Sequence, residues 1–255
     1  MNFLLIRGLA REKGHWADFT ETLAKELSTN VLTIDLPGAG ELCELKSPLK
    51  ISDYTDHMRN QFLKLTRLAN LEDQSNWVVL GISMGGMIAL DWTSRYENDF
   101  KSAILINSSV GDLSLPYERM QPKALIKIFK IVKIKDLISR EKSVLKLSCN
   151  LLTESKRKTC AKIFSKFYIN HKFKKINLFK QLVAASKFKK PKSIKTELLI
   201  LCSKNDKITN YNCSIKIAKY YQSKIIIHQT AGHDIPLDDP HWIIKQLKIQ
   251  LSKIK

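Results

Sequence analysis

The feature that most constrains this chain is a serine flanked by glycines, at the point where an apolar run gives way to a helical pattern. Residues 77–90 read WVVLGISMGGMIAL, which places Ser83 two residues from Gly81 on one side and from Gly85 on the other. A side chain on so sharp a turn adopts strained backbone geometry, so the residues two positions away must lack bulk. The pattern predicts a strand, a tight turn and a helix, with the hydroxyl of Ser83 clear of the backbone.

This placement suits a nucleophile. The serine oxygen would lie at the N-terminus of the helix, where the partial positive charge and the unpaired amide of Met84 favour an oxyanion. A glycine-serine loop without chemistry is the alternative, because G-x-S-x-G occurs by chance in many chains. The context favours the nucleophile, since β-forming residues precede the turn and residues 87–92 continue as a helix that must be buried on one side.

The length of the chain and its cysteines limit the fold and the kinds of site that it can have. A chain of 255 residues is long enough for one α/β domain with a large core and an insertion. The N-terminal apolar run, residues 3–6, is too short for a signal peptide or a membrane span, so we expect a cytoplasmic protein with no transmembrane segment. The cysteines are odd in number and never form a C-x-x-C pair, which argues against a disulfide framework and a zinc site; they are Cys43, Cys149, Cys160, Cys202 and Cys213.

The positive charge of the chain is concentrated in one segment. The formal net charge is +19, and residues 114–190, with 18 Lys, 3 Arg and 4 acidic residues, carry +17 of it. Lysine is abundant throughout the chain, and a general lysine enrichment contributes to the excess. It does not explain why acidic residues become scarce only here. We therefore expect the lysines of this segment to face solvent or a binding partner.

Hydrophobic periodicity predicts an alternation of strands and helices. Short apolar runs predict strands at residues 3–6, 31–34, 77–82, 103–106, 198–201 and 224–228. Helical spacing predicts helices at 16–27, at 51–68 with Ser52 as N-cap, from the turn at Ser83 to about Tyr96, at 212–221 and at 241–254. Apolar strands that alternate with amphipathic helices indicate an α/β fold, a doubly wound and mostly parallel six-stranded sheet covered on both faces.

About ninety residues without a clear strand separate the fourth and fifth predicted strands, far more than an ordinary connection needs. Residues 124–132 and 160–168 are amphipathic at helical spacing. We therefore expect a helical insertion at residues 114–190, a basic lid, on a core formed by residues 1–113 and 191–255.

With these elements in order, the chain resembles the α/β-hydrolase superfamily, and within it the small esterases that carry a helical lid after the sixth strand of the standard fold. The resemblance rests on the G-x-S-x-G turn, the insertion and a Gly-His pair, Gly232-His233, near the C-terminus. It implies that the first two standard strands are absent and that the strand order is 2-1-3-4-5-6.

The resemblance also supplies a catalytic set in the chain order nucleophile, acid, histidine. Ser83 is the nucleophile, Asp206 follows a predicted strand where the family places its acid, and His233 occupies the position of the base. Asp112, after an earlier strand, is the reserve acid, whereas Asp234 and Asp238 are expected to be turn or cap residues. The other histidines have no motif around them and are expected on the surface or in packing: His15, His57, His171, His228 and His241.

The oxyanion hole implied by the resemblance uses two backbone amides, those of Leu9 and Met84, and Gly8 permits the close turn between them. The family normally has His-Gly at this position, whereas this chain has Arg7-Gly8. Arg7 either orients the loop by bonding backbone carbonyls, which we favour, or offers its guanidinium to an anionic group of the substrate.

This set predicts a serine hydrolase that cleaves a carboxylic ester or thioester through an acyl-serine intermediate, with no cofactor and no metal. A serine at the elbow excludes the relatives that use an aspartate there, the haloalkane dehalogenases and epoxide hydrolases. Transfer of the acyl group to an alcohol other than water stays compatible with the same residues.

The substrate depends on the basic lid. An acidic acyl carrier protein fits its charge, and the chain resembles the small esterases that demethylate pimeloyl-acyl-carrier-protein methyl ester in biotin synthesis. A general short-chain carboxylesterase or thioesterase is the nearest alternative. A different class is a non-catalytic binding protein that uses the lid on an anionic membrane or on nucleic acid. We do not expect nucleic acid as the partner.

Overall fold

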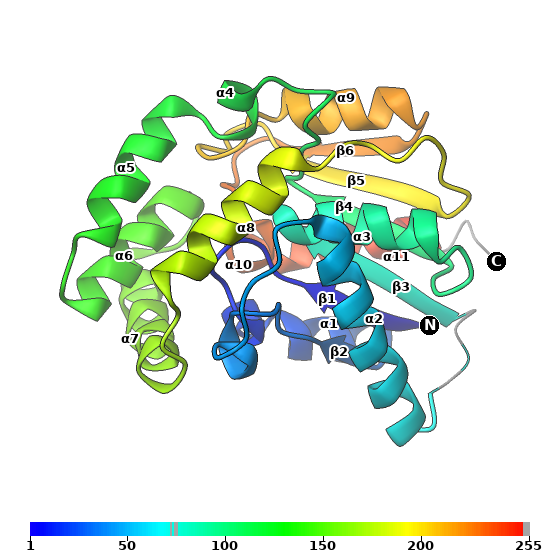
Figure 1. Ribbon diagram of the computed structural model, residues 1–255, viewed down its shortest axis with the longest axis horizontal. Coiled ribbons are helices and arrows are strands. Elements are labelled where there is room, and N and C mark those ends of the chain that lie inside the picture. Colours follow the sequence, from blue (N-terminus) through cyan, green and yellow to red (C-terminus); the bar gives the residue numbers. More distant parts are fainter. Residues whose placement is uncertain (72, 74–75, 252–255) are drawn as a thin grey trace.

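A parallel sheet forms the centre of the fold. The computed structural model describes residues 1–71, 73 and 76–251. Its strands are β1 (Asn2–Ile6), β2 (Val31–Thr33), β3 (Trp77–Ile82), β4 (Ser102–Ile106), β5 (Glu197–Ser203) and β6 (Lys224–His228). They form a six-stranded sheet in the order β2-β1-β3-β4-β5-β6, and every neighbouring pair is parallel (Figure 1). The predicted fold class and strand order are confirmed.

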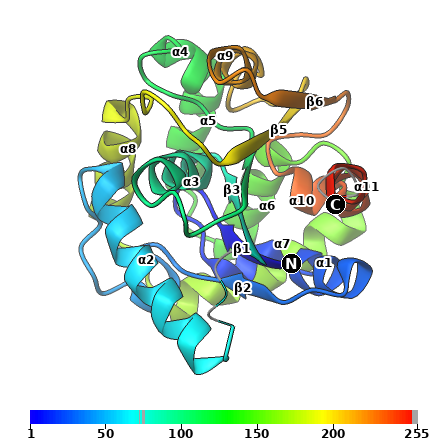
Figure 2. The same ribbon diagram turned by 90° about the vertical axis from the view of Figure 1, so that its right-hand side faces the viewer.

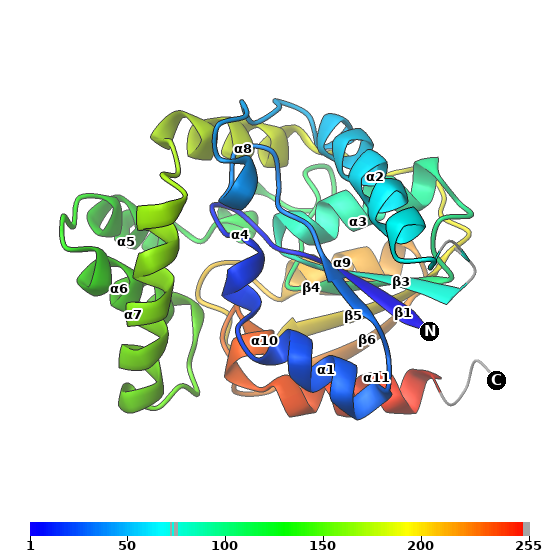
Figure 3. The same ribbon diagram turned by 90° about the horizontal axis from the view of Figure 1, so that it is seen from below.

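Helices cover both faces of the sheet because successive side chains of each strand point to opposite sides. Leu4 and Ile6 of β1 pack with α2 (Ile51–Leu68), α3 (Met84–Arg95) and α9 (Asn212–Tyr220). Phe3 and Leu5 pack with α1 (Phe19–Leu27) and α11 (Pro240–Leu251) on the other face. Figures 2 and 3 show these two helical layers.

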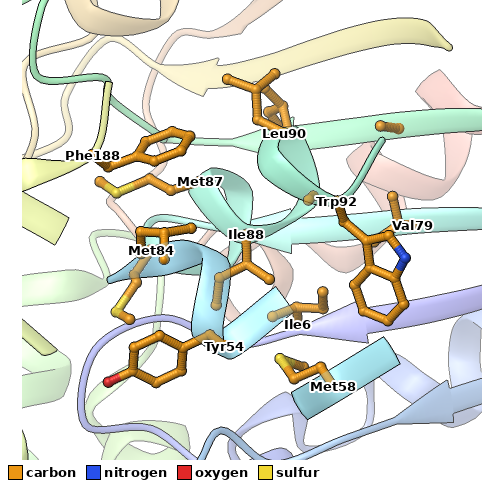
Figure 4. Packing of buried hydrophobic residues seen from close by; sticks show 14 of the residues in the cluster. Ile6, Tyr54, Met58, Val79, Met84, Met87, Ile88, Leu90, Trp92 and Phe188 are labelled. Carbon is orange, nitrogen blue, oxygen red and sulfur yellow. The ribbon is translucent and has the colours of Figure 1, made fainter. Parts of the chain in front are cut away.

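Large apolar side chains fill the layer next to the helix that follows Ser83. Figure 4 shows Ile6 and Val79 of the sheet close to Ile88 and Trp92 of α3 and to Met58 of α2. These side chains are almost completely buried. The turn between β3 and α3 is therefore held from both sides by close packing.

Two local predictions need correction. The predicted helix at 16–27 is two elements, the 3₁₀ helix η1 (Lys13–Trp16) and α1, because the backbone turns at Ala17 with φ 50°. Helix α2 has the predicted bounds, but Lys50 occupies the N-cap position and the hydroxyl of Ser52 bonds to Asp53 instead.

A second 3₁₀ helix, η2 (Gly40–Leu42), follows β2. Of the helix predicted at 241–254, residues 252–254 lie outside the described residues.

The segment between β4 and β5 is helical. It contains α4 (Pro116–Arg119), α5 (Pro122–Val132), α6 (Leu137–Ser148), α7 (Glu154–Asn170) and α8 (Lys175–Lys187), and residues 107–196 contain no strand. We refer to residues 114–190 as the insertion. Its helices lie beyond the carboxyl ends of the strands, next to the short helix α10 (Ile235–Asp238) (Figure 1). Leu145 and Phe164 form a small core of the insertion with Leu237 of α10.

None of the described helices has the length and the apolar character that crossing a bilayer requires. The five cysteines are free thiols, and all except Cys43 are buried.

Candidate active site

Ser83 lies on a strained turn at the carboxyl end of β3. Its φ angle is 57° and its ψ angle is −118°, a combination that residues other than glycine rarely adopt. Helix α3 begins at the next residue. The neighbouring glycines are required by space. A Cβ atom on Gly81 would collide with the carbonyl oxygen of Gly85, and one on Gly85 would collide with that of Ile6. Ser83 itself is partly exposed.

The loop after β1 passes directly beside this serine. A Cβ atom on Gly8 would lie 3.0 Å from the Cβ atom of Ser83, so only glycine permits this approach without displacement. Leu9 follows Gly8, and Met84 opens α3. Among the described residues, no acceptor receives a hydrogen bond from the amide of Leu9 or of Met84. The turn therefore leaves backbone donors free near Ser83.

Asp206 and His233 are joined by a short hydrogen bond. His233 Nδ1 donates to Asp206 Oδ2 at 2.6 Å, and both residues are buried. The other carboxylate oxygen, Oδ1, accepts from the amides of Ile208 at 2.7 Å and Thr209 at 3.1 Å. Because an ionised carboxylate only accepts, Nδ1 carries the proton, and Nε2 is left as the proton acceptor of a neutral imidazole.

Two opposing influences act on the imidazole. Burial of His233 disfavours its protonated form, but the charge of Asp206 and the hydrogen bond to it outweigh burial, so the pKa of His233 is raised above its ordinary value. Asp234 adds to this rise and Arg7 opposes it. The arrangement stabilises an imidazolium, which a general base becomes once it has taken a proton.

The backbone places Ser83 and His233 at neighbouring positions of the same sheet edge. The amide of Ser83 donates to the carbonyl of Ile106 at 2.8 Å, and the side chain of Asn107 donates to the carbonyl of His233 at 2.7 Å. The hydroxyl of Ser83 forms no hydrogen bond with His233 in the structure. Catalytic hydrogen bonds of this kind are often made only in the substrate complex.

Asn107 is a site residue that sequence reasoning missed. It follows β4 with φ 46°, a left-handed conformation that asparagine tolerates. Its Nδ2 binds the loop of His233, and its Oδ1 accepts from the amide of Ser203 at 2.8 Å. It therefore fixes the loop of His233 relative to the end of β5. An asparagine directly after a buried strand was the only signal in the sequence.

Arg7 is engaged differently from either prediction. It forms a two-point ion pair with Asp234, with Nη1 to Oδ1 at 3.1 Å and Nη2 to Oδ2 at 2.5 Å, and it lies 4.7 Å from the ring centre of Trp16. Arg7 and Asp234 are 4% and 6% exposed, so the guanidinium neither binds the backbone carbonyls of its loop nor is open to a substrate.

Asp234 occupies the N-cap position of α10, as predicted, but its side chain has a partner that was not predicted. It precedes α10, but its side chain makes no cap hydrogen bond there and binds Arg7. Burial would raise the pKa of Asp234, but the charge of Arg7 and its hydrogen bonds outweigh burial, so the pKa of Asp234 is lowered. This pair connects the end of β1, and so the loop of Leu9, to the residue that follows His233.

Asp238 is likewise more than a turn residue. Its carboxylate accepts from the amides of Asn150 at 2.8 Å, Leu151 at 2.9 Å and Gly232 at 2.6 Å. It thus joins the insertion to the loop of His233. Asp112, the reserve acid, accepts from the amide and the ammonium group of Lys190, both at 2.9 Å, and is not the carboxylate that binds His233.

The remaining histidines pack or lie near the surface. His15 is buried against Phe164 and Phe167 of α7, and burial together with the charge of Arg11 lowers its pKa well below the ordinary value. His228 is buried, its ring centre lies 4.8 Å from that of Trp242, and it bonds to Asp239. His57, His171 and His241 are partly or fully exposed. His171 borders a small cavity of about 40 Å³ between the loop after β1 and α7.

Comparison with protein families matches residues 2–240 to the family described as serine aminopeptidase, S33. The match spans both the sheet and the insertion. A search of curated proteins found no match.

Solved structures share the fold. The 2-hydroxy-6-oxo-6-phenylhexa-2,4-dienoate hydrolase from Rhodococcus sp. strain RHA1 is similar with a TM-score of 0.78 and 16% identity, over 98% of this chain and 90% of that one. A thermophilic esterase from Thermogutta terrifontis is similar with a TM-score of 0.70 and 18% identity, over 100% of this chain and 90% of that one. A lipase-esterase related protein from Clostridium acetobutylicum ATCC 824 is similar with a TM-score of 0.70 and 18% identity, over 97% of this chain and 93% of that one. At these identities the similarity establishes the fold.

Proposed function

The chain belongs to the serine aminopeptidase, S33 family of α/β hydrolases, and from this premise we propose that it hydrolyses a carboxylic ester through an acyl intermediate on Ser83. The hydrolase class follows from the family, and the ester specificity is our proposal. The observation that supports it best is the 2.6 Å hydrogen bond between Asp206 and His233, at the sheet edge where Ser83 adopts its strained conformation.

In the proposed reaction, Ser83 Oγ attacks the ester carbonyl while His233 Nε2 takes the hydroxyl proton. Asp206 holds the imidazole in the required tautomer and stabilises its protonated form. The amides of Leu9 and Met84 donate to the oxyanion of the tetrahedral intermediate. His233 then gives its proton to the leaving alcohol, and water attacks the acyl-serine by the same route in reverse, which regenerates the free serine.

A fluorophosphonate probe tests the nucleophile. We expect the probe to label wild-type protein and a Ser155→Ala control, whose exposed serine lies on α7, but not Ser83→Ala. Cleavage of p-nitrophenyl esters should follow the labelling, and aminoacyl p-nitroanilides should be poorer substrates. If folded wild-type protein resists the probe and cleaves no ester, a non-catalytic binding protein becomes the better explanation. If it prefers the anilides, the ester specificity is wrong.

We further propose that the insertion acts as a basic lid and that the ester is a methyl ester of an acyl chain on acyl carrier protein, as in the formation of a biotin precursor. The net charge of +17 on residues 114–190 supports this, since an acidic carrier would be attracted to it. Turnover of a carrier-linked ester should fall steeply as salt is raised, while cleavage of a small neutral ester should not. Equal salt dependence of the two would favour a general short-chain carboxylesterase or thioesterase.

A further inference from the structure

Helix α5 exposes more large apolar surface than its packing uses. Ile126 and Phe129 are 57% and 64% exposed, and Leu125 is 40% exposed. The helix is held on its other side, where Ala124 and Ile131 are buried against Leu147 of α6. The three exposed side chains are therefore not needed for the core of the insertion, and exposing them to water is unfavourable.

Lysines surround these apolar side chains without acidic partners. Residues 122–135 contain Lys123, Lys127, Lys130, Lys133 and Lys135 and no acidic residue. All five are exposed, and none forms an ion pair with any residue that the structure describes. Other lysines of the insertion differ, since Lys142 pairs with Glu154 and Lys156 with Asp18. The next acidic residue, Asp136, caps α6 by accepting from the amide of Ser139.

We call Leu125, Ile126 and Phe129 together with these five lysines the α5 surface. Figures 1 and 3 place α5 at the end of the molecule that lies beyond the carboxyl ends of the strands. Leu115 and Tyr117, which are 52% and 59% exposed, add apolar area just before α5 in the chain. The α5 surface thus stands at an outer end of the insertion, where a flat partner can reach it.

We propose that the α5 surface docks the protein on an anionic lipid bilayer. The apolar side chains would enter the boundary between headgroups and acyl chains, and the unpaired lysines would meet anionic headgroups. An acidic soluble protein would match the lysines, but it does not account for Ile126 and Phe129 among them, whereas a bilayer offers both an anionic surface and an apolar layer beneath it. None of the residues of the α5 surface takes part in the proposed reaction, so the inference does not depend on it.

Vesicle sedimentation tests the proposal with the full chain. We expect binding to vesicles of equal parts phosphatidylglycerol and phosphatidylcholine, weak binding to phosphatidylcholine alone, and loss of binding as salt is raised. Ser83→Ala should bind as wild type does, which separates this result from the fate of the proposed catalysis. Equal binding to both vesicle types, or none to either, would overturn the proposal.

Variants locate the contact. Ile126→Glu/Phe129→Glu should weaken binding at least tenfold, whereas Ile169→Glu, which changes an equally exposed isoleucine on α7, should not. Lys127→Gln/Lys130→Gln/Lys133→Gln should weaken binding on the order of 100-fold, since each lysine near the surface contributes about 1 kcal/mol. Each variant should keep the wild-type Tm and the wild-type KM for p-nitrophenyl acetate.

Two results would reassign the surface. If the α5 variants leave vesicle binding unchanged but lose turnover of a carrier-linked ester, the partner is an acidic carrier protein. If they leave vesicle binding unchanged but raise KM for the soluble ester, the apolar side chains serve substrate entry. Either result contradicts docking on lipid.

Discussion

The buried ion pairs of the sheet-bearing core and the α5 surface of the insertion differ in how their charges are partnered. In the core, Arg7 faces Asp234 and His233 faces Asp206, and all four residues are buried. On the α5 surface, lysines lie in water without an acidic partner among the described residues. A buried charge must be paired because desolvation is costly, so its partner fixes geometry. An exposed charge can stay unpaired at little cost, so it remains available to an outside partner.

The largest effect is expected from breaking the hydrogen bond between Asp206 and His233. In Asp206→Asn, the side-chain oxygen can still accept from Ile208 and Thr209, but an amide nitrogen would face His233. The imidazole must then carry its proton on Nε2, where it cannot act as a base. We expect kcat for p-nitrophenyl esters to fall roughly 10³ to 10⁴-fold with little change in Tm.

The pH profile provides an independent readout of the same pair. In the proposed reaction His233 must be neutral to act, so kcat/KM of the wild type should fall as pH drops through its pKa, which Asp206 raises. In Asp206→Asn the neutral amide no longer raises the pKa of His233, so the acid limb of the residual activity should move to lower pH. An unchanged limb would mean that another group sets the profile.

The second prediction concerns the buried ion pair of Arg7 and Asp234. Arg7→Met leaves the carboxylate of Asp234 buried without its partner, and we expect a loss of about 3–5 kcal/mol, on the order of 10 °C in Tm. Urea unfolding measures it. The double variant Arg7→Met/Asp234→Leu should recover much of the loss, because no charge remains to be desolvated. A single variant as stable as the wild type would contradict a structural role for this pair.

Local sequence patterns predicted the sheet and the turn of Ser83, for a physical reason, whereas Asp206 and His233 were supplied by the family resemblance. Periodicity reports which face of an element is buried, and parallel strands bring their carboxyl ends to one edge. Ser83, Asp206 and His233 each follow a strand, so their approach to this edge could be expected. The glycines around Ser83 mark the turn because its backbone excludes any other side chain.

Partners of polar side chains could not be predicted in this way. Arg7 and Asp234 are separated by 227 positions, and nothing near either residue indicates the other. Asn107 and Asp238 also act on backbone groups far along the chain. Which polar groups meet depends on how the loops approach after the core has packed, and hydrophobic periodicity carries no information about that step.

A third, smaller effect tests the connection between the two regions. Asp238 accepts amides of both Gly232 and Asn150, so Asp238→Asn replaces a charged acceptor by one with a single acceptor oxygen. We expect a loss of about 1–3 kcal/mol. Hydrogen exchange at Asn150 and Leu151 should accelerate more than exchange in α1. Uniform acceleration along the chain would show that the carboxylate does not join the insertion specifically.

The smallest effect should come from an exposed ion pair, even though its geometry is good. Glu154 lies 2.5 Å from Lys142 Nζ and 2.7 Å from Arg157 Nη1, and it is exposed. Water screens these contacts, so Glu154→Gln should leave Tm unchanged within error. Glu141, next to Lys142 in the chain, is buried and lies 2.7 Å from Arg11 of the loop after β1, so Glu141→Gln is the matched comparison. We expect it to lower Tm clearly, because it leaves the guanidinium of Arg11 without a charged partner. Equal effects of the two variants would show that burial does not decide how strongly an ion pair stabilises the protein.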